Sequence, residues 1–458
     1  MYKRCYHIHF VGIGGIGMSG IAELLLNLGH KVSGSDLKES EITRRLEALG
    51  ATVAYSHRPE HVLGADVVVV SSAVGPDNPE VTAAGRTQHA PVIRRAEMLA
   101  ELMRLKYAVL VAGAHGKTTT TSMVGTVMAQ GGLDPTVVIG GRLNSWGTNA
   151  KLGRGDFLVA EADESDGTFL LYSPTISVVT NIDSEHLDFF RDLDHIKETF
   201  LEFMNKVPFY GLNILCLEDE NIQSLLPQVN KRLVTYGFSA QADFQARDVE
   251  FSGLSASYLA FHRGQEMGRV TLPIPGWHNV LNSLAAIAVG HELDLEFTAI
   301  CRGLKEMTGV QRRFQIRGEV EGITVIDDYG HHPTEIVATL RAAKECWPDR
   351  RLVVVFQPHR YTRTRDSYEE FVISFNQADL LIIAPIYGAG EEPITGIDSG
   401  TIYHGIKEHG HRAVTLCTGN EEIMALLLNE IKPGDVVLTL GAGDIHHIGT
   451  VLLESIDA

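Results

Sequence analysis

The sequence predicts an α/β protein of three domains. The chain has 458 residues, which corresponds to about three domains at roughly 150 residues each. Short apolar runs typical of strands alternate with helical patterns, and this alternation favours a parallel sheet. Two of these runs end in glycine-rich loops that open a helix, at residues 12–17 and 113–118, and helix N-termini of this kind can bind phosphate.

Composition and charge narrow the class of protein. Hydrophobic residues make up 44% and charged residues 21% of the chain, as in ordinary globular proteins with buried cores. The net charge of -18 argues against a nucleic-acid binder, because phosphate backbones select basic surfaces. Five scattered cysteines without a C-x-x-C pair suit reduced thiols in a cytosol. We find neither a signal peptide nor a run of about 18 apolar residues, so we expect a cytoplasmic protein without a membrane span.

The first block contains a dinucleotide-type glycine loop. The strand HIHFVGIG leads into Gly12, Gly14 and Gly17, and a helix is predicted from Met18 to Leu28. Asp36 ends the next strand, which is the context that the G-x-G-x-x-G fingerprint requires. The loop could hold the pyrophosphate of a nicotinamide cofactor or of a UDP-sugar, or it could be a tight turn without a ligand.

The second block contains a shortened phosphate loop. Val111 stands where the first glycine of G-x-x-x-x-G-K-[ST] would fall, and the nearest glycine is Gly113. The strand YAVLVAG nevertheless leads into Gly113-Ala-His-Gly116 and then Lys117 and Thr118 at a helix start. This order supplies backbone N–H groups, a lysine and a hydroxyl that can bind a metal.

Acidic and histidine residues follow two further strands of this block. Glu161 lies at the end of the strand FLVAE, where a Mg²⁺ ligand belongs in a phosphate-loop fold, so we favour metal binding there. For Glu164 and Asp166 we expect a solvated acidic loop. His186 lies just after another strand end, where it could be either a satisfied polar residue or a ligand.

The third block begins near residue 318 and contains two loops rich in histidine and arginine. IDDYGHHPTE and FQPHRYTRTRD both follow strands, and a helix is predicted from Pro333 to Ala343. Arginines 360, 363 and 365 could hold carboxylates or phosphates with forked hydrogen bonds. For the His331-His332 pair we favour a substrate contact over zinc, because adjacent side chains point in different directions.

Eight segments, in this order along the whole chain, resemble the Mur ligase family of ATP-dependent amide ligases. They are HIHFVGIGGIGMSGIA, GAHGKTTTT, EADESD, TNIDSEHLD, GWHNVLNSLAA, QRRF, DDYGHHPTE and PHRYTRTRD. The phosphate loop of this family reads G-x-x-G-K-T, as Gly113 to Thr118 does here. The loop is therefore interpreted as complete at its own length.

The resemblance implies a function for each domain. Residues 1–106 would form a Rossmann-like domain that binds the UDP-sugar, residues 107–317 a central P-loop-type domain that binds ATP, and residues 318–458 a Rossmann-like domain that brings the amino acid. The reaction would join L-alanine to the lactyl carboxylate of UDP-N-acetylmuramate through an acyl phosphate, giving ADP and phosphate for peptidoglycan precursor synthesis. We expect a monomer or a homodimer.

The resemblance also implies roles for individual residues. Catalysis would depend on Lys117, His186, His331 and Arg360. ATP would contact Gly113, Ala114, His115, Gly116, Lys117, Thr118, Thr119, Asn279, Asn282, Arg313 and Asp328. The substrates would contact Gly14, Gly15, Ile16, Gly17, Asp36, Ser71, His331, His359, Arg360 and Arg363. Two Mg²⁺ ions, for which Mn²⁺ could substitute, would be held by Thr118, Glu161 and His186.

Four other functions compete with this interpretation. A nicotinamide-dependent dehydrogenase would use only the first block, and a P-loop ATPase switch would leave the third block unused. Within the family, a ligase for a murein tripeptide shares most motifs, and PHRYTRTRD favours L-alanine. A ligase for meso-diaminopimelate is disfavoured because the third block lacks a D-N-P-[RK] motif. For His446 and His447, after the last glycine loop, we expect a solvated pair.

Overall fold

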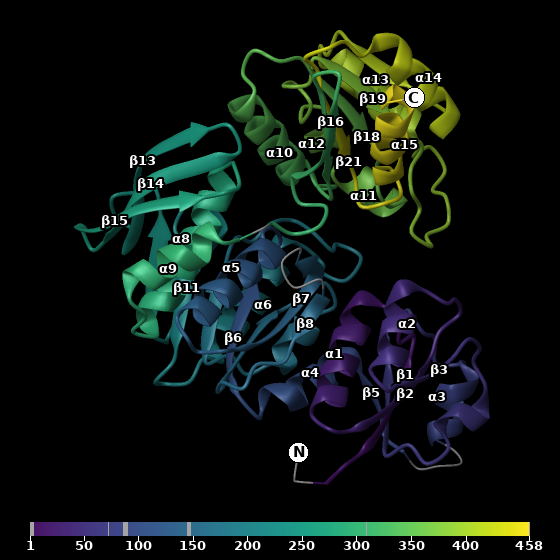
Figure 1. Cartoon of the computed structure of the whole chain (residues 1–458), viewed down its shortest axis with the longest axis vertical. Helices are drawn as coiled ribbons and strands as arrows, with labels where there is room; N and C mark the ends of the chain where they lie inside the picture. Colours follow the sequence, from purple (N-terminus) through teal and green to yellow (C-terminus); the bar gives the residue numbers. More distant parts are fainter. Residues whose placement is uncertain (1–3, 72, 86–89, 144–147, 308, 458) are drawn as a thin grey trace. The chain divides into compact units, whose positions relative to one another are not determined.

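The computed structural model describes residues 4–71, 73–85, 90–143, 148–307 and 309–457. Contacts between Cα atoms divide the chain into two compact units. The first comprises Met1–Ala246, Ala260–Gly268 and Asn282–Thr308, and the second comprises Arg247–Leu259, Arg269–Leu281 and Gly309–Ala458. Three sheets with intervening helices confirm the predicted α/β class (Figure 1). The boundaries at residues 106 and 317 stay a prediction.

The first unit begins with a five-stranded parallel sheet in the order β3-β2-β1-β4-β5. Its strands are β1 (His7–Val11), β2 (Lys31–Ser35), β3 (Thr52–Ala54), β4 (Val67–Val70) and β5 (Val92–Arg94). Its helices are α1 (Ile16–Asn27), α2 (Glu41–Ala48), α3 (Pro79–Ala83) and α4 (Arg95–Met103). The chain moves outward from β1 to β3 and then returns to β4. The carboxyl ends of β1 and β4 therefore form the switch point at which such sheets bind ligands.

The same unit contains most of a larger sheet. Within this sheet the order β12-β11-β10-β6-β9-β7-β8 surrounds β6, whose two neighbours run parallel to it. The strands are β6 (Tyr107–Ala112), β7 (Thr136–Leu143), β8 (Thr148–Lys151), β9 (Phe157–Glu161), β10 (Ile176–Val179), β11 (Leu212–Cys216) and β12 (Leu233–Gly237). The helices are α5 (Lys117–Gln130), α6 (Leu193–Asn205), α7 (Glu220–Leu225) and α9 (Phe297–Lys305), together with the part of α8 (Trp277–Glu292) that begins at Asn282. Because β9, β6 and β10 are adjacent and parallel, the loops that follow them meet at one edge.

Beyond β12, the sheet order continues through three strands that the sequence analysis left unassigned. They are β13 (Phe244–Ser252), β14 (Ser255–His262) and β15 (Gln265–Leu272). Gly253 and Gly264, which lie between them, have positive φ angles of 54° and 79°. Such angles suit glycine in tight turns between strands.

The second unit contains a six-stranded sheet in the order β16-β17-β21-β18-β19-β20. Its strands are β16 (Gln315–Val320), β17 (Ile323–Asp328), β18 (Leu352–Phe356), β19 (Leu380–Ile383), β20 (Val414–Leu416) and β21 (Val436–Leu440). Its helices are α10 (Pro333–Cys346), α11 (Tyr361–Asp366), α12 (Tyr368–Phe371), α13 (Ser399–Glu408), α14 (Asn420–Glu430) and α15 (His446–Asp457). The first strand is antiparallel to the second and was not predicted, whereas the other pairings are parallel.

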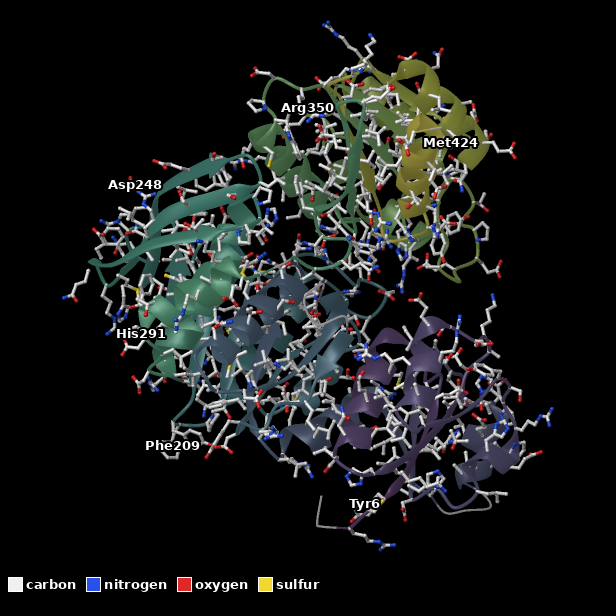
Figure 2. All side chains as sticks on the ribbon, in the orientation of Figure 1. Tyr6, Phe209, Asp248, His291, Arg350 and Met424 are labelled. Carbon is white, nitrogen blue, oxygen red and sulfur yellow. The ribbon has the colours of Figure 1, made fainter. Side chains whose placement is uncertain are left out.

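Alternation along β18 builds a core on each face of this sheet. Val354 and Phe356 pack into one buried cluster, and Val353 and Val355 pack into another. At the amino ends of the strands, the Arg350 guanidinium (Figure 2) donates hydrogen bonds to the carbonyls of Gly322, Gly434 and Asp435. The loops that contain the predicted site residues follow the opposite, carboxyl ends of β17 and β18. Among the helices that the structure describes, none combines the length and apolar character needed to cross a membrane.

Candidate active site

The glycine loop of the first sheet opens onto a cavity of about 630 Å³. The cavity is lined by Gly14, Gly15, Asp36 and Ser71, which therefore come together as predicted positions of one site. The Gly14 N–H donates a 2.8 Å hydrogen bond to Asp36 Oδ2, and a Cβ on Gly14 would lie 2.8 Å from the same oxygen. Asp36 thus holds the glycine loop in place through this hydrogen bond. Helix α1 begins at Ile16, so its N-terminal N–H groups face this loop.

Gly17 lies in the first turn of α1 and packs against another part of the unit. A Cβ on Gly17 would approach Arg95 Nη1 to 2.6 Å. Arg95 also lies 3.7 Å from Asp163, which follows β9. A second cavity, of about 320 Å³, is lined by Ser71, Arg94, Arg95, Asp166 and Thr168, among others. The glycine loop and the acidic loop of the larger sheet therefore border neighbouring spaces.

A buried carboxylate, that of Glu80, contacts His57, which lines the larger cavity. Glu80 is 0% exposed; it accepts a hydrogen bond from Ser35 Oγ at 2.5 Å and contacts His61 Nδ1 at 2.6 Å. His57 Nδ1 lies 3.3 Å and His9 Nε2 3.7 Å from the same side chain. Burial opposes ionisation, but the contacts with His9, Ser35 and His61 lower the pKa of Glu80 to about 2. This network was not predicted from the sequence.

The phosphate loop depends on its two glycines. Gly113 has a φ of 131°, and a Cβ there would lie 2.1 Å from Thr180 Oγ1. Gly116 has a φ of 81°, caps α5, and a Cβ there would lie 2.8 Å from Asn282 Oδ1. Both positions favour glycine because of backbone conformation and because of space. Asn282, predicted near adenine, thus lies beside the loop.

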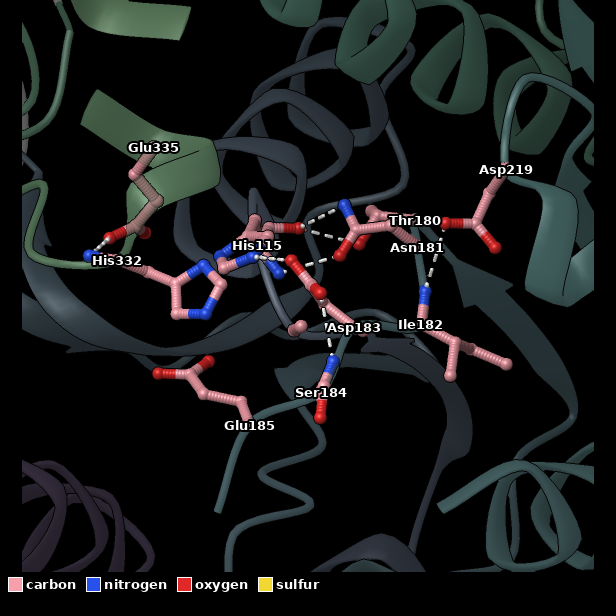
Figure 3. A network of polar contacts seen from close by, with 12 residues as sticks. His115, Thr180, Asn181, Ile182, Asp183, Ser184, Glu185, Asp219, His332 and Glu335 are labelled. Atoms are coloured by element: carbon pink, nitrogen blue, oxygen red, sulfur yellow. Dashed lines mark hydrogen bonds and ion pairs between the residues drawn. The ribbon is translucent and has the colours of Figure 1, made fainter. Parts of the chain in front are cut away.

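The segment after β10 braces the phosphate loop (Figure 3). Thr180 Oγ1 and Asn181 Nδ2 donate to the His115 carbonyl at 2.6 and 3.0 Å, and the His115 N–H donates to Asn181 Oδ1 at 2.8 Å. The His115 ring lies 2.8 Å from Asp183 Oδ2. His115 therefore positions the loop backbone, and the TNID motif supplies its partners. Of these residues, only His115 was predicted as a site residue from the sequence.

Lys117 is folded back onto its own loop. Its ammonium donates hydrogen bonds to the carbonyls of Gly113 and Ala114 at 2.7 and 3.1 Å, and to Glu164 Oε1 at 2.9 Å. Burial lowers the pKa of Lys117, but the charges of Glu164, Asp163 and Glu185 outweigh burial and raise the pKa above its usual range. The lysine is therefore a fixed positive charge at the start of α5.

Glu164 was expected to be a solvated loop residue, and that expectation is wrong. The residue is 2% exposed, because the loop after β9 turns back towards the neighbouring phosphate loop. Its Oε1 atom contacts Lys117 and lies 3.8 Å from His186 Nε2. Its Oε2 atom is buried without a hydrogen-bond partner among the described residues. Burial raises the pKa of Glu164, while Lys117 opposes that rise.

Glu164, Glu185 and His186 offer a candidate cation site in the first unit. One ligand atom from each lies within 4.8 Å of the others. His186 has a left-handed backbone with φ of 58° and is shared with our predicted ligand set. Of the other two predicted ligands, Thr118 is buried at the start of α5 and Glu161 ends β9 next to Val111 of β6. Ligation by these two residues stays a prediction.

In the second unit, Asp328 and Arg313 flank the end of β17. Asp328 is buried and accepts hydrogen bonds from the N–H groups of Phe314 and Gly330 at 2.6 and 2.7 Å. Burial raises the pKa of Asp328 to about 6. Arg313 lies 3.4 Å from Glu335 and stacks 5.3 Å from the Tyr329 ring centroid. Asp328 therefore shapes the turn in which Arg313 is held.

His331, His359, Arg360 and Arg363 come together on the same unit, as the sequence predicted for one site. The rings of His331 and His359 are 5.7 Å apart, and Arg363 Nη1 lies 3.2 Å from His359 Nδ1. Arg360 has a φ of 70° and lies 3.9 Å from Glu391. Burial, followed by the charges of His331, Arg363 and Arg360, lowers the pKa of His359 to about 3. His359 is therefore neutral and orients Arg363.

Asn279, His446 and His447 were also considered from the sequence. Asn279 is buried and donates to the Pro275 carbonyl at 2.6 Å, within the second unit. His447 is exposed and His446 is partly buried, with its Nδ1 3.3 Å from the Gly443 carbonyl. The solvated pair is thus correct for His447 and incomplete for His446. Tyr387, which stacks on His359 at 5.6 Å, and Glu391 were not found from the sequence.

Three family models match the chain in order. Residues 7–107 match the model described as Mur ligase family, catalytic domain, residues 111–290 match the Mur ligase middle domain, and residues 312–443 match the Mur ligase, glutamate ligase domain. Together they account for most of the described sequence.

Similar proteins cover the whole length. The UDP-N-acetylmuramate–L-alanine ligase of Syntrophobacter fumaroxidans is 66% identical over 100% of this chain and 97% of its own, and that of Geotalea daltonii is 60% identical over 100% and 99%. Among solved structures, the UDP-N-acetylmuramate-alanine ligase of Thermotoga maritima matches with a TM-score of 0.83, 30% identity and 99% coverage of both chains. A murein peptide ligase of Psychrobacter arcticus matches with a TM-score of 0.71, 25% identity and 98% coverage of both.

Proposed function

Because this chain belongs to the Mur ligase family, we propose that it is the ATP-dependent ligase that joins L-alanine to UDP-N-acetylmuramate. The observation that carries the proposal is the end-to-end identity to ligases of that name. The lower structural similarity to the murein peptide ligase favours L-alanine over a tripeptide. The reaction would supply a peptidoglycan precursor in the cytoplasm.

The two glycine-rich loops divide the substrates between them. The cavity at Gly14, Gly15, Asp36 and Ser71 would hold the UDP of the sugar nucleotide, with its pyrophosphate at the N-terminus of α1. The smaller cavity beside Arg95 would take the muramyl end, which must reach the phosphate loop. Gly113 to Thr119 would hold the ATP phosphates, and Asn282 would lie close to the same nucleotide.

The residues around Lys117 fit a divalent cation. Carboxylate oxygens are the donors that Mg²⁺ prefers. Oε2 of Glu164, which has no hydrogen-bond partner among the described residues, supplies one that is already buried. The carboxylates of Glu164 and Glu185, which lie close to His186, suit Mn²⁺ as well as Mg²⁺. We propose Thr118, Glu161 and His186 as ligands of two ions. Such ions supply positive charge that lets the γ-phosphate and the lactyl carboxylate approach each other.

The chemistry then has two steps. A lactyl carboxylate oxygen attacks the γ-phosphorus, ADP leaves, and an acyl phosphate forms. Lys117 stabilises the charge on the transferred phosphoryl group during this step. The neutral amine of L-alanine next attacks the acyl carbon, phosphate leaves with the former carboxylate oxygen, and the nitrogen releases a proton.

The arginine cluster would hold the amino acid. Arg360 and Arg363 would bind the L-alanine carboxylate, leaving the amine free to attack. Neutral His359 would act by orienting Arg363 through its 3.2 Å contact, and with a pKa of about 3 it is a poor base. His331 would contact the same amino acid. Arg313 and Asp328 would contribute to the ATP site.

Phosphate release tests the substrate assignment. The purified protein is mixed with ATP, Mg²⁺ and UDP-N-acetylmuramate, and phosphate is measured with L-alanine, glycine, L-serine or the murein tripeptide. We expect turnover with L-alanine. Turnover with the tripeptide alone would make the chain a murein-tripeptide ligase. Phosphate release that no sugar nucleotide stimulates would favour a P-loop ATPase switch.

A further inference from the structure

Lys117 has no free proton for a phosphate in this structure. A lysine ammonium has three N–H donors. In the part of the chain that the structure describes, they match three acceptors within hydrogen-bond distance, namely the Gly113 and Ala114 carbonyls and Glu164 Oε1. Two of these acceptors belong to the loop that the phosphates must enter. A phosphate oxygen can therefore bind the ammonium only if at least one of the three bonds breaks.

The bond to Glu164 has the largest electrostatic consequence when a nucleotide arrives. The Glu164 carboxylate is buried, and a polyphosphate at the loop would face it across a short, poorly hydrated distance. The neighbouring Asp163 has a second cation, Arg95, at 3.7 Å. For Glu164, the cationic groups within 4.0 Å in the described chain are Lys117 and, when protonated, His186. Moving Lys117 to the phosphates would leave this carboxylate poorly compensated.

The other oxygen of Glu164 shows how the charge could be compensated. Oε2 is buried and lacks a hydrogen-bond partner among the described residues, although such atoms are normally satisfied. Ligand atoms of Glu185 and His186 lie within 4.8 Å of the Glu164 ligand atom. A divalent cation that enters with the nucleotide could therefore be bound by the Glu164 carboxylate or lie close enough to compensate its charge.

We propose that Glu164 is a positioning residue that holds Lys117 on the loop in the nucleotide-free enzyme and releases it when a divalent cation arrives with ATP. This inference rests on the proposed function, since it takes ATP as the ligand of the loop. The cation then has a second effect besides neutralising phosphate. It replaces Lys117 as the partner of Glu164 and so frees the ammonium. Cation and nucleotide binding are therefore coupled through this one carboxylate.

Calorimetric titration of ATP into the full-length protein tests the proposal without turnover. Affinity is measured in excess EDTA and in excess Mg²⁺ for the wild type and for Glu164→Gln. In the wild type we expect Mg²⁺ to strengthen ATP binding by about tenfold or more. In Glu164→Gln, ATP should bind in EDTA about tenfold more tightly than to the wild type, and the gain from Mg²⁺ should shrink to a few-fold. Unchanged affinity in EDTA together with an unchanged Mg²⁺ gain would overturn the proposal.

Two further variants make the result specific. Glu202→Gln on α6 makes the same chemical change at a side chain that is 59% exposed and pairs with Lys206, and it should match the wild type in both titrations. Glu164→Asp keeps the charge but shortens the reach to Lys117, so affinity in EDTA should rise even if Glu164→Gln fails to fold. If the ATP affinity of Glu164→Asp in EDTA did not rise, the proposal that Glu164 holds Lys117 on the loop would be refuted. A wild type that binds ATP in neither condition would instead refute the proposed function.

Discussion

Acid should weaken the first sheet through one residue, Glu80, and the size of the effect follows from the structure. The pKa of Glu80 is lowered from 4.5 to about 2 in the folded protein. A depressed carboxyl pKa stabilises the fold above the unfolded pKa, and that stabilisation is lost as the pH falls towards the folded pKa. The shift corresponds to about 3 kcal/mol at neutral pH, of which about 2 kcal/mol would be lost by pH 3.

Amide hydrogen exchange followed by mass spectrometry can measure this effect locally. Peptides that cover β1 and β2 report the opening free energy of the sheet that holds His9 and Ser35, after correction for intrinsic exchange rates. Glu80→Gln should destabilise these peptides at pH 7, and the difference from the wild type should shrink by about 2 kcal/mol between pH 5 and pH 3. Comparing the two proteins at each pH removes the contribution of other titrating groups.

A control variant and the pH dependence of the difference in opening free energy test this prediction. Glu60→Gln changes an exposed glutamate in the adjoining segment and should leave the opening free energy unchanged at both pH values. If the difference between Glu80→Gln and the wild type stays constant from pH 5 to pH 3, the carboxylate does not have the depressed pKa, and the reasoning is refuted.

The remaining predictions concern the two nucleotide sites and the amino-acid site. Lys117→Ala should lower the rate of phosphate release at least about 100-fold while UDP-N-acetylmuramate binding by calorimetry stays unchanged, and equal loss of both would mean that the two loops are misassigned. Gly113→Ala should weaken ATP binding about tenfold or more, because its Cβ would lie 2.1 Å from Thr180 Oγ1, and wild-type affinity would contradict the loop geometry. Arg363→Lys should raise the KM for L-alanine about tenfold or more with little change in the KM for the sugar nucleotide, since a lysine cannot form the forked contact, and a change in the sugar KM alone would contradict the assignment.

Local patterns explain what could be predicted from the sequence. The phosphate loop is six consecutive residues between a strand and a helix, so its spacing is visible directly, and Gly113 and Gly116 have the backbone conformations that its pattern implies. The helix that begins at Pro333 follows from that residue alone, although it extends to Cys346 and not only to Ala343. Capping residues and short periodic runs contain this information within a few positions.

Non-local pairing explains what could not be predicted. Burial of Glu164 depends on β9 lying next to β6, and a single sequence does not specify that neighbour order. The Glu80 network joins side chains that are far apart in the sequence. His9 lies on β1, Ser35 ends β2, and Glu80 itself lies on α3. The antiparallel strand β16 likewise pairs with β17 across a short turn. It spans the predicted domain boundary at residue 317, and its residues are exposed or half-buried, so it lacks the apolar run by which other strands were predicted.

The most direct test of the proposed acyl-phosphate mechanism is to follow oxygen from the lactyl carboxylate into the released phosphate. UDP-N-acetylmuramate labelled with ¹⁸O in the lactyl carboxylate is incubated with the enzyme, ATP, Mg²⁺ and L-alanine, and the released phosphate is analysed by mass spectrometry. An acyl-phosphate ligase must place one carboxylate oxygen in each phosphate, together with one amide bond per ADP formed. Phosphate without ¹⁸O, or ADP formed without amide, would contradict the account.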